Sequence, residues 1–183
     1  MPLRNTATDW GWLAKALHWA VAAGIFWLIW LGLTQADMPR GAEKQAVRAT
    51  HASWALLVLA LMALRLVWRL TNETPAHPVG TPGWQRVTAT TVHWAIYALV
   101  FTQLVAGAMV FATGGNALPF FDLFSIPLPV AEDRDAHEFW EEIHEFVWKP
   151  LLAIVVLHFL AALYNHFMRR NDVLRRMTVG SRT

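Results

Sequence analysis

The chain has 183 residues, of which 56% are hydrophobic and 15% charged, with a formal net charge of +2. A composition this apolar excludes an ordinary soluble domain of this length. The chain has no cysteine, which excludes a disulfide framework, thiolate-bound iron–sulfur clusters and haem attached covalently through a C-x-x-C-H motif.

Four long apolar stretches follow one another along the chain, at residues 12–33, 49–70, 91–112 and 146–167. Each reaches the roughly 20 residues that a membrane-spanning helix needs. The few charged residues within them lie near their ends, where long side chains reach water: Lys15, Arg65, Arg69 and Lys149. We therefore predict an all-α integral membrane four-helix bundle that forms one domain over residues 1–183.

The connections between these stretches differ in character. The first, 34–48, is short and polar, and the second, 71–90, is rich in proline and glycine and is expected to be extended rather than helical. The third connection, 113–145, has a turn-rich half at 114–129 and an acidic, aromatic half at 131–145. We expect the second half to continue as helix into the fourth span.

The placement of lysine and arginine predicts that both termini are cytoplasmic. With the termini inside, the inner segments hold ten of the 15 basic residues and the outer segments hold five, which satisfies the positive-inside rule. The clearest contribution comes from the tail after the fourth span, which contains Arg169, Arg170, Arg175, Arg176 and Arg182.

Histidines occur at two depths in the predicted bundle. His144 and His158 lie fourteen residues apart in the fourth span, so both leave nearly the same helix face, about 21 Å apart along the axis. His51 opens the second span at the outer level, beside His144. At the inner level, His158 is joined by either His18 or His93.

Two haems b, each held by two imidazoles from different helices, would use four of these histidines. Cofactor sites of this kind form between the helices of bundles. Two strong axial ligands leave iron no open position, which suits electron transfer. The alternatives are histidines that only pack at the interface, and a haem-free membrane scaffold or metal-ion binder. Metal-transport sites usually recruit carboxylates at mid-membrane, whereas the middle of these spans is apolar.

Arg65 lies at the inner level, fourteen residues after His51. We expect its guanidinium to neutralise a haem propionate or to hold a quinone carbonyl; the alternative is simple anchoring of the span by positive charge on the inner side.

Short motifs run in order over almost the whole chain: KALHW at 15–19, THAS at 50–53, RLVWRL at 65–70, VHWAIY at 92–97, IHE at 143–145 and LHFLAA at 157–162. In these the sequence resembles the bacterial cytochrome b561 family, most closely its superoxide oxidase (superoxide:ubiquinone oxidoreductase) members. The resemblance implies a multi-pass protein of the bacterial inner membrane that carries two haems b within the lipid bilayer.

The resemblance also resolves the inner pair. It implies that His18 and His158 ligate the iron of the inner haem and that His51 and His144 ligate that of the outer haem. His93 is then left for a quinone site on the inner side. Its expected companions as quinone or propionate contacts are Arg65 and His166. No catalytic residue is assigned.

The activity implied by the resemblance is oxidation of superoxide, or of another periplasmic electron donor, coupled to reduction of ubiquinone. An alternative is a b-type haem subunit that passes electrons from a hydrogenase or formate dehydrogenase partner to quinone. A nucleic-acid partner is not expected. The chain departs from the superoxide oxidase pattern at Asn165-His166, where a His-His pair is expected, and in its second connection, which lacks lysine.

The charge of the third connection opposes an anionic substrate, because a steering field for superoxide must be locally positive. This connection carries a single basic residue, Arg134, against acidic residues that include Asp122, Glu132, Asp133, Asp135, Glu138, Glu141 and Glu142. We expect any positive patch at the outer haem to come from Arg40, Lys44, Arg48 and Lys149.

Overall fold

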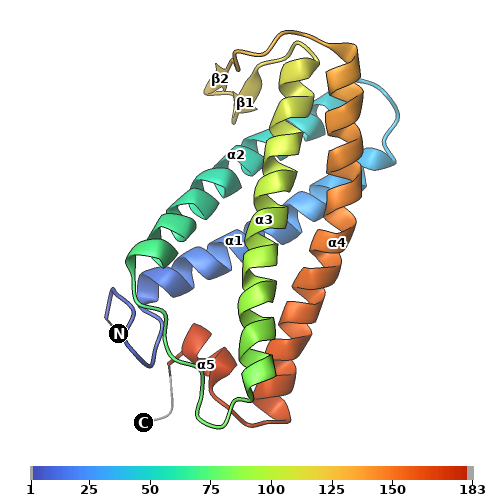
Figure 1. Ribbon diagram of the computed structural model, residues 1–183. Coiled ribbons are helices and arrows are strands. Elements are labelled where there is room, and N and C mark those ends of the chain that lie inside the picture. Colours follow the sequence, from blue (N-terminus) through green and yellow to red (C-terminus); the bar gives the residue numbers. More distant parts are fainter. Residues whose placement is uncertain (1, 181–183) are drawn as a thin grey trace.

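The computed structural model describes residues 2–180 and is mostly helical (Figure 1). The elements in chain order are α1 (Trp12–Ala36), α2 (Ala42–Thr71), α3 (Gly83–Thr113), β1 (Leu118–Phe120), β2 (Phe124–Ile126), α4 (Arg134–Phe167) and α5 (Val173–Met177). The four long helices are all long and apolar enough to cross a membrane. The predicted four-helix membrane bundle is confirmed.

The helices extend beyond the apolar stretches that predict them. Residues 83–90, which the sequence pattern assigns to an extended connection, form the first two turns of α3 instead. The prolines of the connection lie before this segment and do not interrupt the helix. The last of them, Pro82, is the N-cap of α3, and a proline at a helix start costs no hydrogen bond. The expected continuation of the fourth span is confirmed: α4 begins at Arg134, with the Asp133 carboxylate accepting from the Ala136 amide at 2.8 Å.

A small β-hairpin in the turn-rich half of the third connection is not foreseen by the sequence analysis. Its strands β1 and β2 pair antiparallel, and the turn includes Phe121 and Asp122, with φ of 47° and 57°. Ser53 on α2 holds the hairpin: its hydroxyl lies 3.1 Å from the Pro119 carbonyl and accepts from the Phe121 amide at 3.0 Å. The hairpin is therefore attached to α2 two residues after His51.

The helices pack mainly as two pairs, α1 with α2 and α3 with α4 (Figure 1). Val58 and Val100 are almost fully buried in the apolar core between them. The first pair crosses closely at Gly24, where an added Cβ would lie 2.5 Å from Val58 Cγ2. Pro150 lies inside α4 without ending it, so His144 and His158 belong to one helix.

The two ends of the bundle differ. We call the end that carries β1 and β2 the hairpin end, and the opposite end, where residues 2–11 and α5 lie, the terminal end (Figure 1). At the terminal end Ala76 joins both segments, because its amide donates to the Ala7 carbonyl at 2.9 Å and its carbonyl accepts from Arg176 at 2.7 Å. The membrane orientation stays a prediction, and Arg182, which contributes to it, lies outside the described residues.

Candidate functional site

At the hairpin end, His51 of α2 and His144 of α4 face one another. Their ring centroids are 6.3 Å apart and their planes are inclined by 72°. A cavity of about 620 Å³ surrounds them and is lined by all four long helices. Its volume lies within the range of sites that hold small molecules and cofactors.

His144 is held by Gln103 of α3. Its Nδ1–H donates to the backbone carbonyl of Gln103 at 3.1 Å, because a carbonyl only accepts. The Gln103 side-chain amide donates in return to the His144 carbonyl, also at 3.1 Å. These bonds set the ring orientation and leave Nε2 as the nitrogen with a free lone pair, an arrangement typical of histidines that bind metals.

Two glycines make room beside the rings of this pair. An added Cβ on Gly32 of α1 would lie 3.6 Å from His51 Cε1, and one on Gly107 of α3 would lie 3.0 Å from His144 Cε1. The His51 Nδ1 atom is buried and has no hydrogen-bond partner in the part of the chain that the structure describes. The cavity therefore presents imidazoles to its interior with little side-chain bulk beside them.

Three histidines meet near the terminal end. His158 of α4 lies 6.3 Å from His18 of α1 and 5.3 Å from His93 of α3, measured between ring centroids. The two inner-level candidates thus both contact the same ring. Depth in the bundle therefore does not decide whether His18 or His93 is the partner of His158.

The centroid distances can be compared with the requirements of iron held by two imidazoles. A metal–imidazole bond is about 2 Å long and a ring centre lies roughly 1.1 Å behind its nitrogen, so two rings that hold one iron between them would have centres roughly 6.2 Å apart. His51 and His144 match this distance, and so do His18 and His158. The separation of His93 and His158 is shorter. Two of the histidine pairs therefore fit a bis-imidazole haem iron.

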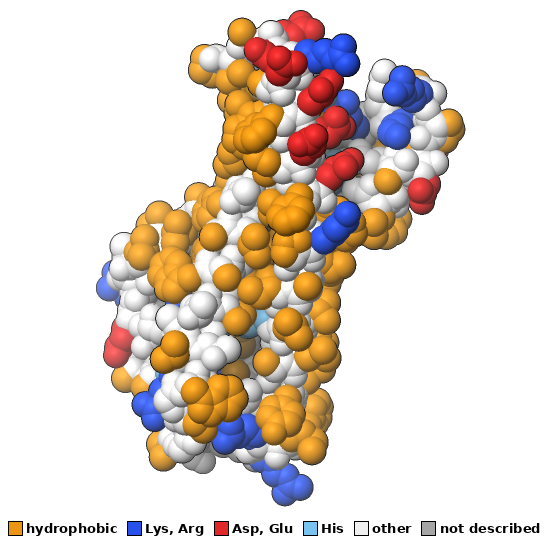
Figure 2. Space-filling view, turned by 45° about the vertical axis from the view of Figure 1, so that its right-hand side comes forward, with side chains coloured by type: hydrophobic (Ala, Val, Ile, Leu, Met, Phe, Trp, Pro, Cys, Tyr) orange, Lys and Arg blue, Asp and Glu red, His pale blue; other side chains and the backbone are white. Residues whose placement is uncertain are grey.

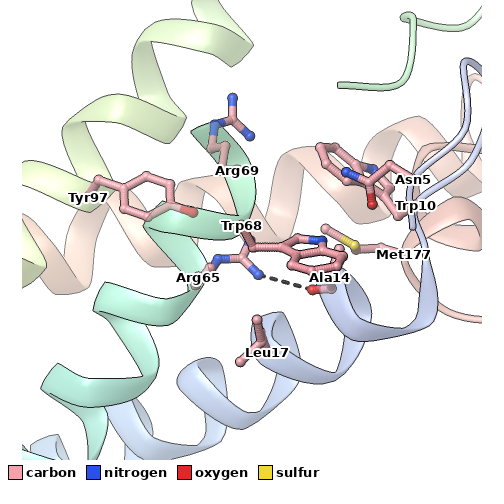
Figure 3. Close-up of a pocket in the computed structure, with 9 residues that line it drawn as sticks. All are labelled: Asn5, Trp10, Ala14, Leu17, Arg65, Trp68, Arg69, Tyr97 and Met177. Carbon is pink, nitrogen blue, oxygen red and sulfur yellow. Dashed lines mark hydrogen bonds between the residues drawn. The ribbon is translucent and has the colours of Figure 1, made fainter. Parts of the chain in front are cut away.

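Arg65 contacts one of the inner-level histidines, His18, directly. Its Nη2 lies 3.1 Å from His18 Nδ1, and its Nη1 donates to the Ala14 carbonyl at 3.2 Å. Figure 3 shows its side chain extending from α2 toward the α1 backbone, beside Trp68 and Tyr97, in a small pocket of about 20 Å³. The level of Arg65 is predicted from its position in the sequence, but its contact with an imidazole is not.

His166 lies in the last turn of α4, where its ring contacts Phe167 at 4.8 Å between centroids. It does not line the pocket beside Arg65. Its neighbour Asn165 is buried and joins the ends of α3 and α4, since its side-chain oxygen accepts from Gln85 at 3.0 Å.

Several residues of the hairpin-end site are missed by sequence analysis, namely Gln103, Gly32 and Gly107. Gln103 is a polar side chain within an apolar span, and this signal points to function. The glycines carry no comparable signal, because small residues also occur wherever membrane helices pack closely.

Charged residues of both signs lie around the hairpin-end cavity. Three of the four predicted basic residues line it, namely Lys44, Arg48 and Lys149, together with Glu141 and Glu145. Arg40 is not among its lining residues. Figure 2 shows acidic side chains gathered at this end of the molecule, with basic side chains beside them.

A family model described as prokaryotic cytochrome b561 matches residues 9–180. The chain belongs to this family. The cytochrome b561 family consists of membrane electron-transfer proteins that bind b-type haem, so this chain is a bacterial multi-pass oxidoreductase of that kind.

Relatives of the chain are similar over nearly their full length. Cytochrome b561 homolog 2 of Escherichia coli (strain K12) is 25% identical over 179 residues, covering 97% of this chain and 95% of that protein. Cytochrome b561 homolog 1 of the same strain is 25% identical over 174 residues, covering 88% and 92%. The probable superoxide oxidase CybB of Yersinia pestis is 25% identical over 168 residues, covering 90% and 93%.

Proposed function

We propose that this cytochrome b561 carries two haems b and transfers electrons from superoxide at the hairpin end to ubiquinone at the terminal end. The observation that carries the proposal is that two histidine pairs, at different levels of one bundle, have the same centroid separation of 6.3 Å. This separation is close to the roughly 6.2 Å expected for two imidazoles that hold one iron, which supports the proposal.

Under this proposal His51 and His144 hold the haem iron at the hairpin end, and His18 and His158 hold the other. A haem held by two histidines in this way would supply one-electron transfer rather than oxygen binding. The short separation of His93 and His158 supports the choice of His18. We propose that His93, Arg65 and His166 lie near the quinone.

We further propose that the hairpin end faces the periplasm and the terminal end the cytoplasm, in a bacterial inner membrane. The arginines of the tail support this orientation, because basic residues concentrate on the cytoplasmic side. Each superoxide gives up one electron and leaves as dioxygen. Ubiquinone takes two electrons, from two superoxides, and two protons to become ubiquinol.

Two observations support superoxide as the donor. The relative from Yersinia pestis is named a probable superoxide oxidase. In addition, three basic residues line the hairpin-end cavity against two acidic ones, Glu141 and Glu145, so the lining carries a small excess of positive charge, which favours an anion. The basic residues are Lys44, Arg48 and Lys149.

The test mixes purified protein with enzymatically generated superoxide and a soluble ubiquinone. We expect b-type absorption bands of reduced haem to appear and to disappear again as ubiquinone is reduced, with a haem content of two per chain. Added superoxide dismutase should abolish the reduction. Reduction that persists with dismutase would contradict the donor, and one haem per chain would contradict the di-haem proposal.

A second candidate donor is a protein partner, as in the haem subunits of hydrogenases and formate dehydrogenases. The acidic side chains at the hairpin end favour it (Figure 2), because they would pair with a basic docking face. Purification in mild detergent separates the candidates: a stoichiometric iron–sulfur subunit that reduces the haems faster than superoxide would favour the partner.

A further inference from the structure

One histidine of each pair has an Nδ1 partner, and the two partners are of opposite character. At the hairpin end, His144 Nδ1–H donates to the backbone carbonyl of Gln103 at 3.1 Å. At the other level, His18 Nδ1 faces the guanidinium of Arg65, also at 3.1 Å. One ligand pair is therefore set against the negative end of a peptide dipole, and the other against a full positive charge.

These partners act on a bound iron in opposite directions. A hydrogen bond from the imidazole to a carbonyl makes the ligand more basic, which favours oxidised iron. Reduction by one electron removes one positive charge at the iron, so a neighbouring cation favours the reduced form. Arginine stays charged in proteins, and a half-buried position strengthens its field relative to that of a charge in water.

We propose that Arg65 makes the His18/His158 haem the more oxidising of the two, so that electrons move downhill from the hairpin end to the terminal end. This inference rests on the proposed di-haem function. Iron ligation through Nε2 would place the ring proton on His18 Nδ1, which then could not accept a hydrogen bond from Arg65. Arg65 would therefore act on this ligand through its charge alone, over a distance longer than 3.1 Å. Its hydrogen bond to the Ala14 carbonyl keeps that charge beside the ring.

The charges at the hairpin end do not reproduce this effect. The three basic residues that line the cavity are accompanied by Glu141 and Glu145, and Lys149 and both glutamates are solvent-exposed. Exposed charges are screened by water and salt. Arg65, by contrast, contacts a histidine of the pair.

The test is a redox titration of the purified holoprotein, followed through the b-type absorption bands. Arg65→Gln removes the charge and keeps an amide donor for the Ala14 carbonyl, and we expect it to make reduction of one haem about tenfold less favourable, equivalent to about 59 mV for one electron. Arg65→Lys keeps the charge and should restore most of the difference. Arg69→Gln is the matched control, because Arg69 lies one turn later on α2 and contacts the Trp94 ring instead of an imidazole.

Single-haem variants assign the two potentials and remain informative if Arg65→Gln fails to fold. His51→Ala should leave the terminal-end haem with the higher midpoint potential, and His18→Ala the hairpin-end haem with the lower one. The reverse order of potentials would overturn the inference, as would midpoint potentials in Arg65→Gln that equal those of the wild type. A fall in midpoint potential in Arg65→Lys or Arg69→Gln as large as in Arg65→Gln would also overturn it. A wild-type protein without two haems would instead overturn the proposed function.

Discussion

Gln103 and His144 hold one another through two hydrogen bonds that run in opposite directions between α3 and α4. The ring donates to the backbone of α3, and the amide of α3 donates to the backbone of α4. Together the two bonds restrict the movement of the His144 ring relative to α3. The orientation of this imidazole therefore depends on α3, a helix that supplies no histidine to the pair.

Replacing Gln103 with leucine should weaken haem binding at the hairpin end. The substitution leaves the Gln103 backbone carbonyl in place but removes the amide that holds α4, and loss of a partner that orients a metal ligand typically costs about 10–100-fold in affinity. Haem content per chain, measured by pyridine extraction during stepwise dilution in detergent, gives the result. Gln45→Leu, at an exposed position of α2, is the control and should retain both haems.

The two glycines beside the hairpin-end pair should respond differently to the same methyl group. In Gly107→Ala the added carbon meets the His144 ring at 3.0 Å, which displaces the ring, whereas in Gly32→Ala it meets the His51 ring at 3.6 Å, an ordinary van der Waals contact. We expect Gly107→Ala to lose the hairpin-end haem or shift its spectrum and Gly32→Ala to keep it. Equal behaviour of the two variants would argue against the proposed role of these rings.

Replacing His18 and His93 by alanine, one at a time, distinguishes which of them ligates haem iron together with His158. Since the centroid distance to His158 is 6.3 Å for His18 and 5.3 Å for His93, His18→Ala should lose one haem per chain and His93→Ala should keep both. With His93 near the quinone, His93→Ala should also slow the reoxidation of reduced haem by ubiquinone. Loss of a haem in His93→Ala, with retention in His18→Ala, would reverse the assignment.

Ser53→Ala should release the β-hairpin from α2. The substitution removes the hydroxyl that accepts from the Phe121 amide, and a hydrogen bond of this kind contributes about 0.5–1.5 kcal/mol. Limited proteolysis of the protein in detergent should show faster cleavage in the hairpin. The matched control is Thr50→Ala, because the Thr50 hydroxyl donates only within α2, to the Ala46 carbonyl at 2.9 Å, and cleavage should stay at the wild-type rate.

Superoxide steering is tested by reversing one charge at the cavity. Lys149→Glu should slow superoxide-driven haem reduction several-fold at low ionic strength, and the difference from wild type should shrink as salt screens the field. Arg40→Glu makes the same change outside the cavity lining and should have a smaller effect. Equal rates in wild type and Lys149→Glu at low salt would speak against superoxide entering here.

The spans and the depths of the histidines could be predicted from the sequence because both depend on distance along one helix. An apolar stretch of about 20 residues defines a spanning helix, and counting residues along it places His144 and His158 at different levels. The helix ends are less predictable, since α2, α3 and α4 continue past the apolar stretches to Ala42, Gly83 and Arg134, where no change of hydrophobicity marks their start.

What remained beyond sequence analysis depends on how the helices lie beside one another. Periodicity along a helix does not say which neighbour its side chains meet, so the contacts of Gln103 with His144 and of Arg65 with His18 follow only from packing. The hairpin depends in the same way on Ser53, sixty-six residues from its partner Pro119.

The sequence by itself determined a four-span membrane bundle with histidines at two levels, because hydrophobic length and helical rise act within a single segment. Only the tertiary structure decided which imidazoles stand 6.3 Å apart and which partners face their second nitrogens. Those distances arise between helices, where lateral packing sets them.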